Sequence, residues 1–474
     1  MIDLSKVKHV HCIGIGGIGL SAVAKIMLNE GYTVSGSDMN ESEMVDKLIE
    51  SGATVYLGHR EKNIKDADLI VYSSAIPKTN PERAAAEEKG IPSVTRAQLL
   101  GHLMEEKKCS VAVAGAHGKT TTTSIISLLM INAGLDPTVL VGGNLKEISG
   151  NVRLGTSDYF VTEACEYMDS FLSLSPKYAV ILNIDLDHLD YFTGIDHIVG
   201  SFNKFVRLVP EDGAIVVFDA NPFVPSIIRG LDRRVITFGY SDKNEYSASD
   251  IVWNEEGFPS FIVRNLGEPL CTVQLAMPGE HNILNALAAI ACCHDMGVST
   301  EIITDTLAGF TGTQRRFDVQ GSTSSGVTII DDYAHHPVEI DATIKAARKI
   351  PHGKLWILFQ PHTYTRTLAL HDDFAKALEK ADKIVMAEIY AAREKNTKQI
   401  TSKTIATEIK NINPAKETFF FKEFEDIANF VLNNAEADDL VITMGAGDIY
   451  KVGERILEID AESLGRSSDA KKIL

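Results

Sequence analysis

The sequence predicts an α/β protein with three domains built on parallel sheets. Short apolar runs alternate with helix-like stretches along the chain, which is the pattern of parallel strands joined by crossover helices. The length of 474 residues corresponds to three domains of about 150 residues each. Apolar residues make up 45% of the chain and charged residues 23%, which is typical of a folded globular protein.

Two segments divide the chain into its predicted domains. A charged stretch at 105–108 ends the first block, and the segment GTQRRFD at 312–318 ends the second. Within the second block, residues 213–277 are rich in strand-like runs separated by polar turns, which favours an antiparallel flank beside the parallel sheet. The predicted domains are 1–106, 107–314 and 315–474.

Charge, cysteine spacing and hydropathy exclude several classes of protein. The net charge of −18 makes the surface acidic, whereas nucleic acids and anionic membranes require clustered Lys and Arg. The six cysteines show no CxxC spacing, which argues against a disulfide framework or a thiolate zinc site and indicates a reducing compartment. No apolar run approaches the ~20 residues of a membrane span, and the first ten residues lack the apolar core of a signal peptide. We therefore expect a cytoplasmic protein with neither a nucleic-acid nor a membrane partner.

The strongest motif is AGAHGKTTTT at 114–123, between an apolar strand and a helix. Glycines let backbone amides surround phosphate oxygens, and the helix N-terminus adds positive potential. Lys119 is expected to reach the β- and γ-phosphates, and the Thr120 hydroxyl to ligate Mg²⁺. Because Val113 occupies the first glycine position of GxxxxGK[ST], the alternative is a glycine-rich turn before an ordinary helix. The predicted ATP-binding residues of this loop are Gly115, Ala116, His117, Gly118, Lys119, Thr120 and Thr121.

Glu163 and His188 each follow or end a buried-strand pattern, DYFVTE and YAVILNIDLDH. Ligands of an open parallel sheet bind beyond the carboxyl ends of its strands, which is also the edge that carries the phosphate loop. A carboxylate and a neutral imidazole there suit metal ions that bridge phosphate oxygens. The alternative is that His188 is an ordinary polar surface residue.

The segment GIGGIG, at 14–19, follows one strand and precedes a helix, and Asp38 ends the next strand. This is a GxGxxG fingerprint with an acid at a suitable distance, which alone suggests NAD. The stretch between Gly19 and Gly115 is too short for two mononucleotide halves and a hydride-transfer domain. The motif therefore favours a pyrophosphate and leaves the nucleoside open.

Three weaker groups of polar residues occur later in the chain. GEHNILN, at 279–285, places His281, Asn282 and Asn285 at the start of a helix, where amides can read a base edge; capping of that helix is the alternative. DDYAHHP at 331–337 and FQPHTYTR at 359–366 each follow a strand pattern. The alternative is that the histidines of these two motifs only make hydrogen bonds within the protein and that Arg366 is an ordinary surface cation.

Ten segments together closely resemble the Mur ligase family. In chain order they are HCIGIGGIGLSAVA, SDMNES, GAHGKTTTT, EACEYMDSFL, NIDLDHLDYF, GEHNILNALAA, GTQRRFD, DDYAHHP, FQPHTYTR and ITMGAGDIY. So many ordered matches are far more specific than any single motif. The resemblance implies a Rossmann-like N-terminal domain that binds a UDP-sugar and a central P-loop ATPase-type domain that binds ATP. It also implies a Rossmann-like C-terminal domain that helps hold the nucleotide and an amino acid.

The resemblance also implies a reaction. ATP phosphorylates a carboxylate, and an amine attacks the acyl phosphate, with ADP and phosphate as products. The glycine fingerprint favours the subgroup that joins L-alanine to the lactyl carboxylate of UDP-N-acetylmuramic acid in peptidoglycan precursor synthesis. The implied ligands are ATP, Mg²⁺, UDP-N-acetylmuramic acid and L-alanine, and we expect a monomer or weak dimer.

Roles for single residues follow from the resemblance. Lys119 is implied to neutralise the transferring phosphoryl group. Thr120 and Glu163 are implied to hold one Mg²⁺, with His188 on a second, while His335 and Arg366 face the amino acid. The implied nucleotide contacts outside the phosphate loop are His281, Asn282 and Asn285 at adenine, and Arg316 and Asp332 at phosphate and ribose. The implied UDP-sugar contacts are Gly14, Ile15, Gly16, Gly17, Gly19, Asp38, Ser73 and Ser74.

Three positions depart from the usual pattern of the family. Ala116 stands where many relatives have the Thr of GTHGKT. EACEYMD replaces the commoner EADESD, which rearranges the acids near Glu163. Thr363 replaces an Arg of FQPHRYTR, so Arg366 is the one arginine left in this motif.

Two alternatives remain open. One is a Mur-type ligase that attaches a preformed peptide. The other is a nicotinamide-dependent oxidoreductase that uses the GIGGIG loop.

Overall fold

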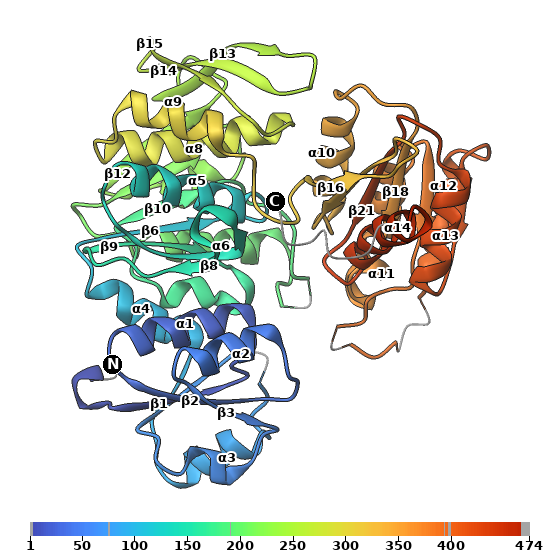
Figure 1. Cartoon of the computed structure of the whole chain (residues 1–474). Coiled ribbons are helices and arrows are strands. Elements are labelled where there is room, and N and C mark those ends of the chain that lie inside the picture. The colour runs from blue at the N-terminus through green and yellow to red at the C-terminus, as the bar shows by residue number, and fades with distance from the viewer. Residues whose placement is uncertain (1–2, 74–75, 190, 393, 397–399, 466–474) are drawn as a thin grey trace. The chain divides into compact units, whose positions relative to one another are not determined.

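The computed structural model describes residues 3–73, 76–189, 191–392, 394–396 and 400–465, and Figure 1 shows the course of the chain. Contacts divide the chain into two compact units. Unit 1 contains Met1–Asp185, Ile195–Phe238 and Ala288–Ile302; unit 2 contains Leu186–Gly194, Gly239–Leu287 and Ile303–Leu474. The predicted α/β class is confirmed, since strands of largely parallel sheets alternate with helices. Among the described residues, no helix combines the length and hydropathy that a membrane crossing requires.

The first sheet, in unit 1, has five parallel strands in the order β3-β2-β1-β4-β5. The order reverses between β1 and β4, which is where doubly wound sheets bind their ligands. The strands are β1 His9–Ile13, β2 Thr33–Asp38, β3 Thr54–Leu57, β4 Leu69–Tyr72 and β5 Ser93–Thr95. The helices are α1 Ile18–Asn29, α2 Glu43–Glu50, α3 Pro81–Glu88 and α4 Arg96–Glu105.

The central sheet of unit 1 carries the order β12-β11-β10-β6-β9-β7-β8. Its pairs are parallel except β7 with β8. The apolar strands β6, β10 and β11 are buried on both faces, as a parallel sheet requires. The strands are β6 Cys109–Ala114, β7 Thr138–Leu145, β8 Gly150–Arg153, β9 Tyr159–Ala164, β10 Tyr178–Ile181, β11 Ala214–Phe218 and β12 Arg234–Gly239. The helices are α5 Lys119–Asn132, α6 Ile195–Val206 and α7 Val224–Ile228.

The predicted antiparallel region is confirmed in part. In unit 2, β13 Tyr246–Trp253, β14 Pro259–Asn265 and β15 Glu268–Gln274 form an antiparallel meander. The prediction was wrong for the first part of 213–277, because β11 and β12 pair in parallel. Helix α7 lies between these two strands and makes the crossover that a parallel pair needs. Helices α8 Glu280–Asp295 and α9 Thr300–Gly309 follow the meander.

The third sheet, in unit 2, has six strands in the order β16-β17-β21-β18-β19-β20 and is parallel except for β16. Helices α10 to α12 contribute to the apolar core on one face of the sheet, and α13 and α14 contribute to that on the other (Figure 1). The strands are β16 Asp318–Ser322, β17 Thr328–Asp332, β18 Leu355–Phe359, β19 Lys383–Met386, β20 Glu417–Phe420 and β21 Leu440–Met444. The helices are α10 Pro337–Ala347, α11 Tyr364–Leu378, α12 Ser402–Ile412, α13 Phe424–Asn434 and α14 Tyr450–Ser463.

Candidate active site

The predicted phosphate loop joins β6 to α5. Gly118 has φ +84°, a left-handed conformation that ordinary side chains avoid, and it precedes the first residue of α5. Asn183, just after β10, fixes the loop: its Oδ1 accepts from the His117 amide at 2.9 Å, and its Nδ2 donates to the His117 carbonyl at 3.0 Å. The amides at the start of α5 and the positive end of the helix dipole together make a site for an anion.

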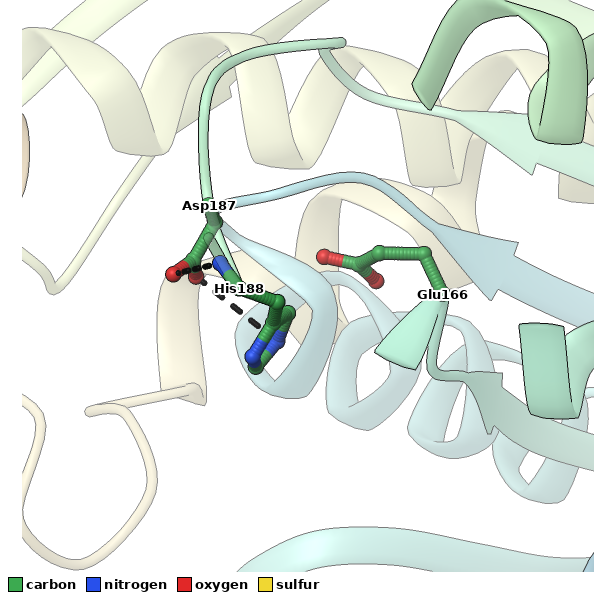
Figure 2. Close-up of side chains that lie close together, drawn as sticks. All are labelled: Glu166, Asp187 and His188. Atoms are coloured by element: carbon green, nitrogen blue, oxygen red, sulfur yellow. Dashed lines mark hydrogen bonds and ion pairs between the residues drawn. The ribbon is translucent and has the colours of Figure 1, made fainter. Parts of the chain in front are cut away.

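Lys119 extends back over this loop. Its Nζ donates to the carbonyl of Gly115, to that of Ala116 at 3.2 Å, and to Glu166 Oε2 at 3.2 Å. The Lys119 side chain is 16% exposed and that of Glu166 3%. Glu166, which is drawn in Figure 2, follows β9 and serves as the counter-ion of Lys119. Glu166, which belongs to the altered EACEYMD motif, therefore forms an ion pair with Lys119, the predicted catalytic lysine.

Thr120 and Glu163 lie on either side of two glycines of β7. Glu163 Oε1 accepts from the Gly142 amide at 2.6 Å. A Cβ at Gly142 would lie 2.6 Å from Glu163 Oε2, and one at Gly143 would lie 3.2 Å from Thr120 Cγ2. A larger residue at Gly142 would therefore force the Glu163 carboxylate to move, and one at Gly143 would press on the Thr120 methyl group. The GG pair in VLVGGNL was the signal for this arrangement, and sequence reasoning did not use it.

His188 lies in the loop 186–194, which belongs to unit 2. Its backbone has φ +52° and its amide donates to Asp187 Oδ1 at 2.6 Å (Figure 2). Asp187 also accepts from Arg366 Nη2 at 2.9 Å. Burial opposes ionisation of Asp187, but the charges of His188 and Arg366 hold the pKa of this carboxyl well below its usual range. Asp187 was not among the predicted site residues.

The two motifs of the C-terminal domain meet around Arg366. The ring centroids of His335 and His362 lie 6.0 Å apart, and His362 Nδ1 lies 3.3 Å from Arg366 Nη1. Burial lowers the pKa of His335 to about 4 against the opposing effect of Glu339. Burial and the Arg366 charge lower the pKa of His362 to about 4 as well. Both imidazoles are therefore neutral near pH 7, and Arg366 carries the positive charge.

Thr363, which replaces the family's arginine, is the residue before α11. Its φ of +64° and ψ of +146° are unusual for a β-branched residue. The Thr363 amide donates to the Tyr390 carbonyl at 2.9 Å, and the Thr367 hydroxyl donates to the Thr363 carbonyl at 2.7 Å. The backbone bonds of this residue hold the entry to α11, on whose first turn Arg366 lies.

Arg316 and Asp332 also lie near each other, beside the start of the third sheet. Asp332 is 6% exposed and accepts from the amides of Phe317 and Ala334, each at 2.8 Å. Burial raises the pKa of Asp332 to about 6, although the Arg316 charge acts in the opposite direction. The Arg316 guanidinium lies 5.1 Å from the ring centroid of Tyr333.

The predicted adenine contacts lie on the first turns of α8. Asn282 donates to the Pro278 carbonyl at 2.8 Å, and Asn285 donates to Asn282 Oδ1 at 3.1 Å. Both asparagines are 7% exposed, whereas His281 is exposed. The amides thus fix the start of the helix, and contact with adenine stays a prediction for all three residues.

The GIGGIG loop turns from β1 into α1. The amides of Gly14 and Ile15 donate to the Ser37 carbonyl at 2.8 and 3.1 Å, and the Gly16 amide donates to Asp38 Oδ2 at 2.9 Å. Asp38 therefore holds the loop, as well as lying where a sugar nucleotide is predicted. Ser73 follows β4, and its carbonyl accepts from the amide of residue 76. Ser74 lies outside the described residues.

Family models match the chain in three consecutive segments. The catalytic domain of the Mur ligase family matches 9–108, the Mur ligase middle domain matches 113–293, and the glutamate ligase domain of Mur ligases matches 315–447. These matches agree with the order of the three sheets along the chain.

Individual relatives are similar to this chain over nearly its full length. The UDP-N-acetylmuramate–L-alanine ligase of Acetivibrio thermocellus is 50% identical over 459 residues, 97% of each chain. That of Caldanaerobacter subterraneus is 49% identical over 96% of this chain and 99% of the relative. The solved UDP-N-acetylmuramate-alanine ligase of Thermotoga maritima has a TM-score of 0.81 at 29% identity and covers 96% of this chain and 100% of that one. A murein peptide ligase of Psychrobacter arcticus has a TM-score of 0.72 at 26% identity, covering 96% and 98%. The resemblance inferred from the motifs is confirmed, and the chain belongs to the Mur ligase family.

Proposed function

We propose that this chain joins L-alanine to the lactyl carboxylate of UDP-N-acetylmuramic acid, with conversion of ATP to ADP and phosphate. The observation that carries the proposal is the full-length identity of about one half to relatives named UDP-N-acetylmuramate–L-alanine ligase. A carboxylate oxygen attacks the γ-phosphorus of ATP and ADP leaves. The amine of L-alanine then attacks the acyl carbon, and phosphate leaves. The product belongs to peptidoglycan precursor synthesis.

The phosphate loop is the ATP site of this proposal. The amides at the start of α5 receive phosphate oxygens, with the β- and γ-phosphates next to Lys119. Glu166 holds the Lys119 ammonium over the loop through its contact at 3.2 Å. His281, Asn282 and Asn285 lie by adenine, and Arg316 and Asp332 by phosphate and ribose.

Mg²⁺ fits the donors near this loop. The Thr120 hydroxyl and the Glu163 carboxylate are hard oxygen ligands on the two sides of Gly142 and Gly143. When bound, Mg²⁺ neutralises phosphate charge. His188 is proposed as a ligand of a second ion. The Gly142 amide positions the Glu163 carboxylate by donating a hydrogen bond to it.

The amino-acid site lies at Arg366 and His335. A guanidinium is suited to grip a carboxylate with two hydrogen bonds. His335 is neutral, since burial lowers its pKa to about 4, and a ring nitrogen without a proton can accept a hydrogen bond from the amine. The Asp187 carboxylate orients Arg366 at 2.9 Å.

The proposal assigns a ligand to each of the three predicted domains. Residues 1–106 bind the UDP-sugar through the GIGGIG loop, residues 107–314 bind ATP, and residues 315–474 complete the nucleotide and amino-acid sites. We expect a monomer or weak dimer that acts in the cytoplasm.

A second function has one supporting observation, the likeness to a murein peptide ligase at 26% identity. Such an enzyme would take a preformed peptide in place of L-alanine. Phosphate release should be measured with ATP, UDP-N-acetylmuramic acid and either L-alanine, other amino acids or an L-alanine-containing tripeptide. Turnover with L-alanine at least tenfold above the other acceptors supports the proposal. Preference for the tripeptide would replace it by the second function. Reduction of added NAD⁺ without phosphate release would favour the oxidoreductase alternative.

A further inference from the structure

Glu339, in the first turn of α10, contacts both the backbone and the ring of His335. Its Oε2 accepts from the His335 amide at 3.0 Å and lies 3.3 Å from Nδ1 of the same residue. The amide of His336 donates to the same oxygen at 3.3 Å. The contact with His336 is that of a capping box, whereas the contact with the imidazole is not part of helix capping. Glu339 therefore makes a contact that the start of α10 does not require.

The neighbours of the His335 ring determine which of its nitrogens carries the proton. Nδ1 lies 3.0 Å from the Tyr333 carbonyl oxygen and 3.3 Å from Glu339 Oε2. A carbonyl oxygen and an ionised carboxylate only accept hydrogen bonds, so the proton is on Nδ1. Because burial keeps the ring neutral near pH 7, Nε2 has a free lone pair. Within the described part of the chain Nε2 makes no hydrogen bond, and the side chain is 18% exposed.

Three charged groups act on the His335 ring besides its burial. Burial has the largest effect and disfavours the protonated ring; Glu339 comes next and favours it. Arg366 disfavours the protonated ring, and Asp187 favours it. Glu339 Oε1 lies 3.9 Å from Arg316 Nη1, and the Glu339 side chain is 13% exposed. A nearby cation and two amide donors stabilise the negative charge of a carboxylate, so Glu339 can offset positive charge on the neighbouring imidazole.

We propose that Glu339 is a positioning residue for the second step of the reaction, in which the amine attacks the acyl phosphate. It holds His335 in the tautomer whose Nε2 can accept a proton, and it stabilises the imidazolium that then forms. The bond between the uncharged amine nitrogen and the acyl carbon forms, and the C–O bond to phosphate breaks with its electron pair. One proton of the nitrogen passes to His335 Nε2 and from there to water. A carboxylate that orients and stabilises a histidine base has this effect in other acyl transfers. This inference rests on the proposed function.

The test separates the two chemical steps in rapid-quench single turnovers with ATP, UDP-N-acetylmuramic acid and saturating L-alanine. ADP formation measures phosphorylation of the carboxylate, and formation of the ligated product measures attack by the amine. Glu339→Gln keeps an oxygen that can accept from the amides of His335 and His336, but it removes the charge beside the ring. We expect product formation to slow by about 100-fold, while the rate of ADP formation stays near that of wild type.

A double variant shows whether Glu339 acts through His335. His335→Gln should itself slow product formation, and addition of Glu339→Gln should slow it no further, because both changes act on one imidazole. Glu301→Gln is the matched control, because Glu301 is an exposed acid in the first turn of another helix, α9. This control should form ADP and product at the wild-type rates.

Equal slowing of ADP and product formation in Glu339→Gln would overturn the inference, since a general structural role has that effect. Unchanged product formation would overturn it too, as would an undiminished effect of Glu339→Gln in the His335→Gln background.

Failure of the proposed function gives a different result. A wild-type enzyme that uses the L-alanine-containing tripeptide but not L-alanine would refute the proposed function alone. The same variants are then compared with the tripeptide, whose amine attacks in the same step, and the outcomes above decide the inference. A wild-type enzyme that forms ADP with neither acceptor would refute both.

Discussion

Arg366 donates a hydrogen bond from Nη2 to Oδ1 of Asp187 at 2.9 Å. The Arg366 side chain is 13% exposed and that of Asp187 9%, so the pair is largely withdrawn from water. The second terminal nitrogen, Nη1, faces His362 Nδ1 at 3.3 Å. These contacts orient the Arg366 guanidinium in the proposed amino-acid site. The same site contains His335, which is neutral because burial lowers its pKa to about 4.

Replacing Arg366 should affect the amino-acid substrate most. Arg366→Ala removes the proposed partner of the L-alanine carboxylate, and a lost charge-assisted hydrogen bond corresponds to about a 10- to 100-fold effect. We expect the apparent KM for L-alanine to rise by that factor, with the KM values for ATP and the UDP-sugar nearly unchanged. Steady-state phosphate release with each substrate varied in turn measures this.

Arg366→Lys separates charge from geometry, because lysine keeps the charge but lacks the planar pair of donors. It should fall between wild type and Arg366→Ala. Arg348→Ala is the control, since Arg348 pairs with Asp382 at an exposed site where ion pairs contribute little. Normal L-alanine dependence of Arg366→Ala would mean that another cation holds the carboxylate.

Lys119→Ala should reduce turnover by at least two orders of magnitude while the protein stays folded. The ammonium lies over the phosphate loop, and removal of a cation from developing phosphoryl charge costs several kcal/mol of transition-state stabilisation. Single-turnover phosphate release measures the rate, and circular dichroism checks the fold. Lys204→Ala, at an exposed position of α6, is the matched control. More than about a tenth of wild-type turnover in Lys119→Ala would remove Lys119 from the catalytic role.

Much of the fold followed from local sequence. Parallel strands buried on both faces read as continuous apolar runs, and β6, β10 and β11 were recognisable for that reason. The GIGGIG and GAHGKT loops were found because each lies directly between a strand and a helix. The parallel pairing of β11 with β12 was missed, since the single short turn of α7 gives little helical pattern.

The missing site residues belong to contacts between distant segments. Asp187 meets Arg366 across 179 positions of the chain. No period or motif relates such pairs, because their spacing depends on how the chain returns to one sheet edge. Glu166 differs from Asp187 in this respect, because it lies within the EACEYMD motif, whose departure from the family pattern is visible in the sequence. Its partner, Lys119, could not be inferred from that motif.

Gly142→Ala should disturb the proposed metal site without replacing either of the proposed ligands. A Cβ there would lie 2.6 and 2.7 Å from the carboxylate oxygens of Glu163, so the carboxylate must move. We expect a higher Mg²⁺ concentration for half-maximal activity, as for Glu163→Gln. The double variant should be no worse than Glu163→Gln alone, because both changes act on one carboxylate.

A magnesium titration of activity measures this requirement in all three variants. Gly200→Ala is the control, because its Cβ would meet no atom within 4 Å and alanine favours a helix. Additive effects of Gly142→Ala and Glu163→Gln would indicate that Gly142 acts on something other than Glu163.

The last prediction concerns the pH dependence of stability and Asp332. Burial raises the pKa of Asp332 to about 6, above the ~3.9 of an unfolded aspartate. The folded chain therefore holds this proton more tightly than the unfolded chain. As pH rises from about 4 to about 6, this group must lower the free energy of unfolding, by roughly 3 kcal/mol in total. Below pH 4 the effect is absent, and above pH 6 it is complete.

Asp332→Asn removes the titrating group, while its carbonyl oxygen can still accept from the Phe317 or Ala334 amide. The difference in free energy of unfolding between variant and wild type should therefore move in favour of the variant across this pH window. Urea unfolding at several pH values between 4 and 7 measures that difference, and other titrating groups cancel in it. Asp372→Asn, at an exposed position of α11, should show a nearly flat difference. A flat difference for Asp332→Asn as well would mean that the folded protein leaves the pKa of Asp332 near its ordinary value. The variant should at the same time lose affinity for ADP, because the same carboxylate is proposed to meet the ribose, so a gain in stability and a loss of binding are expected together.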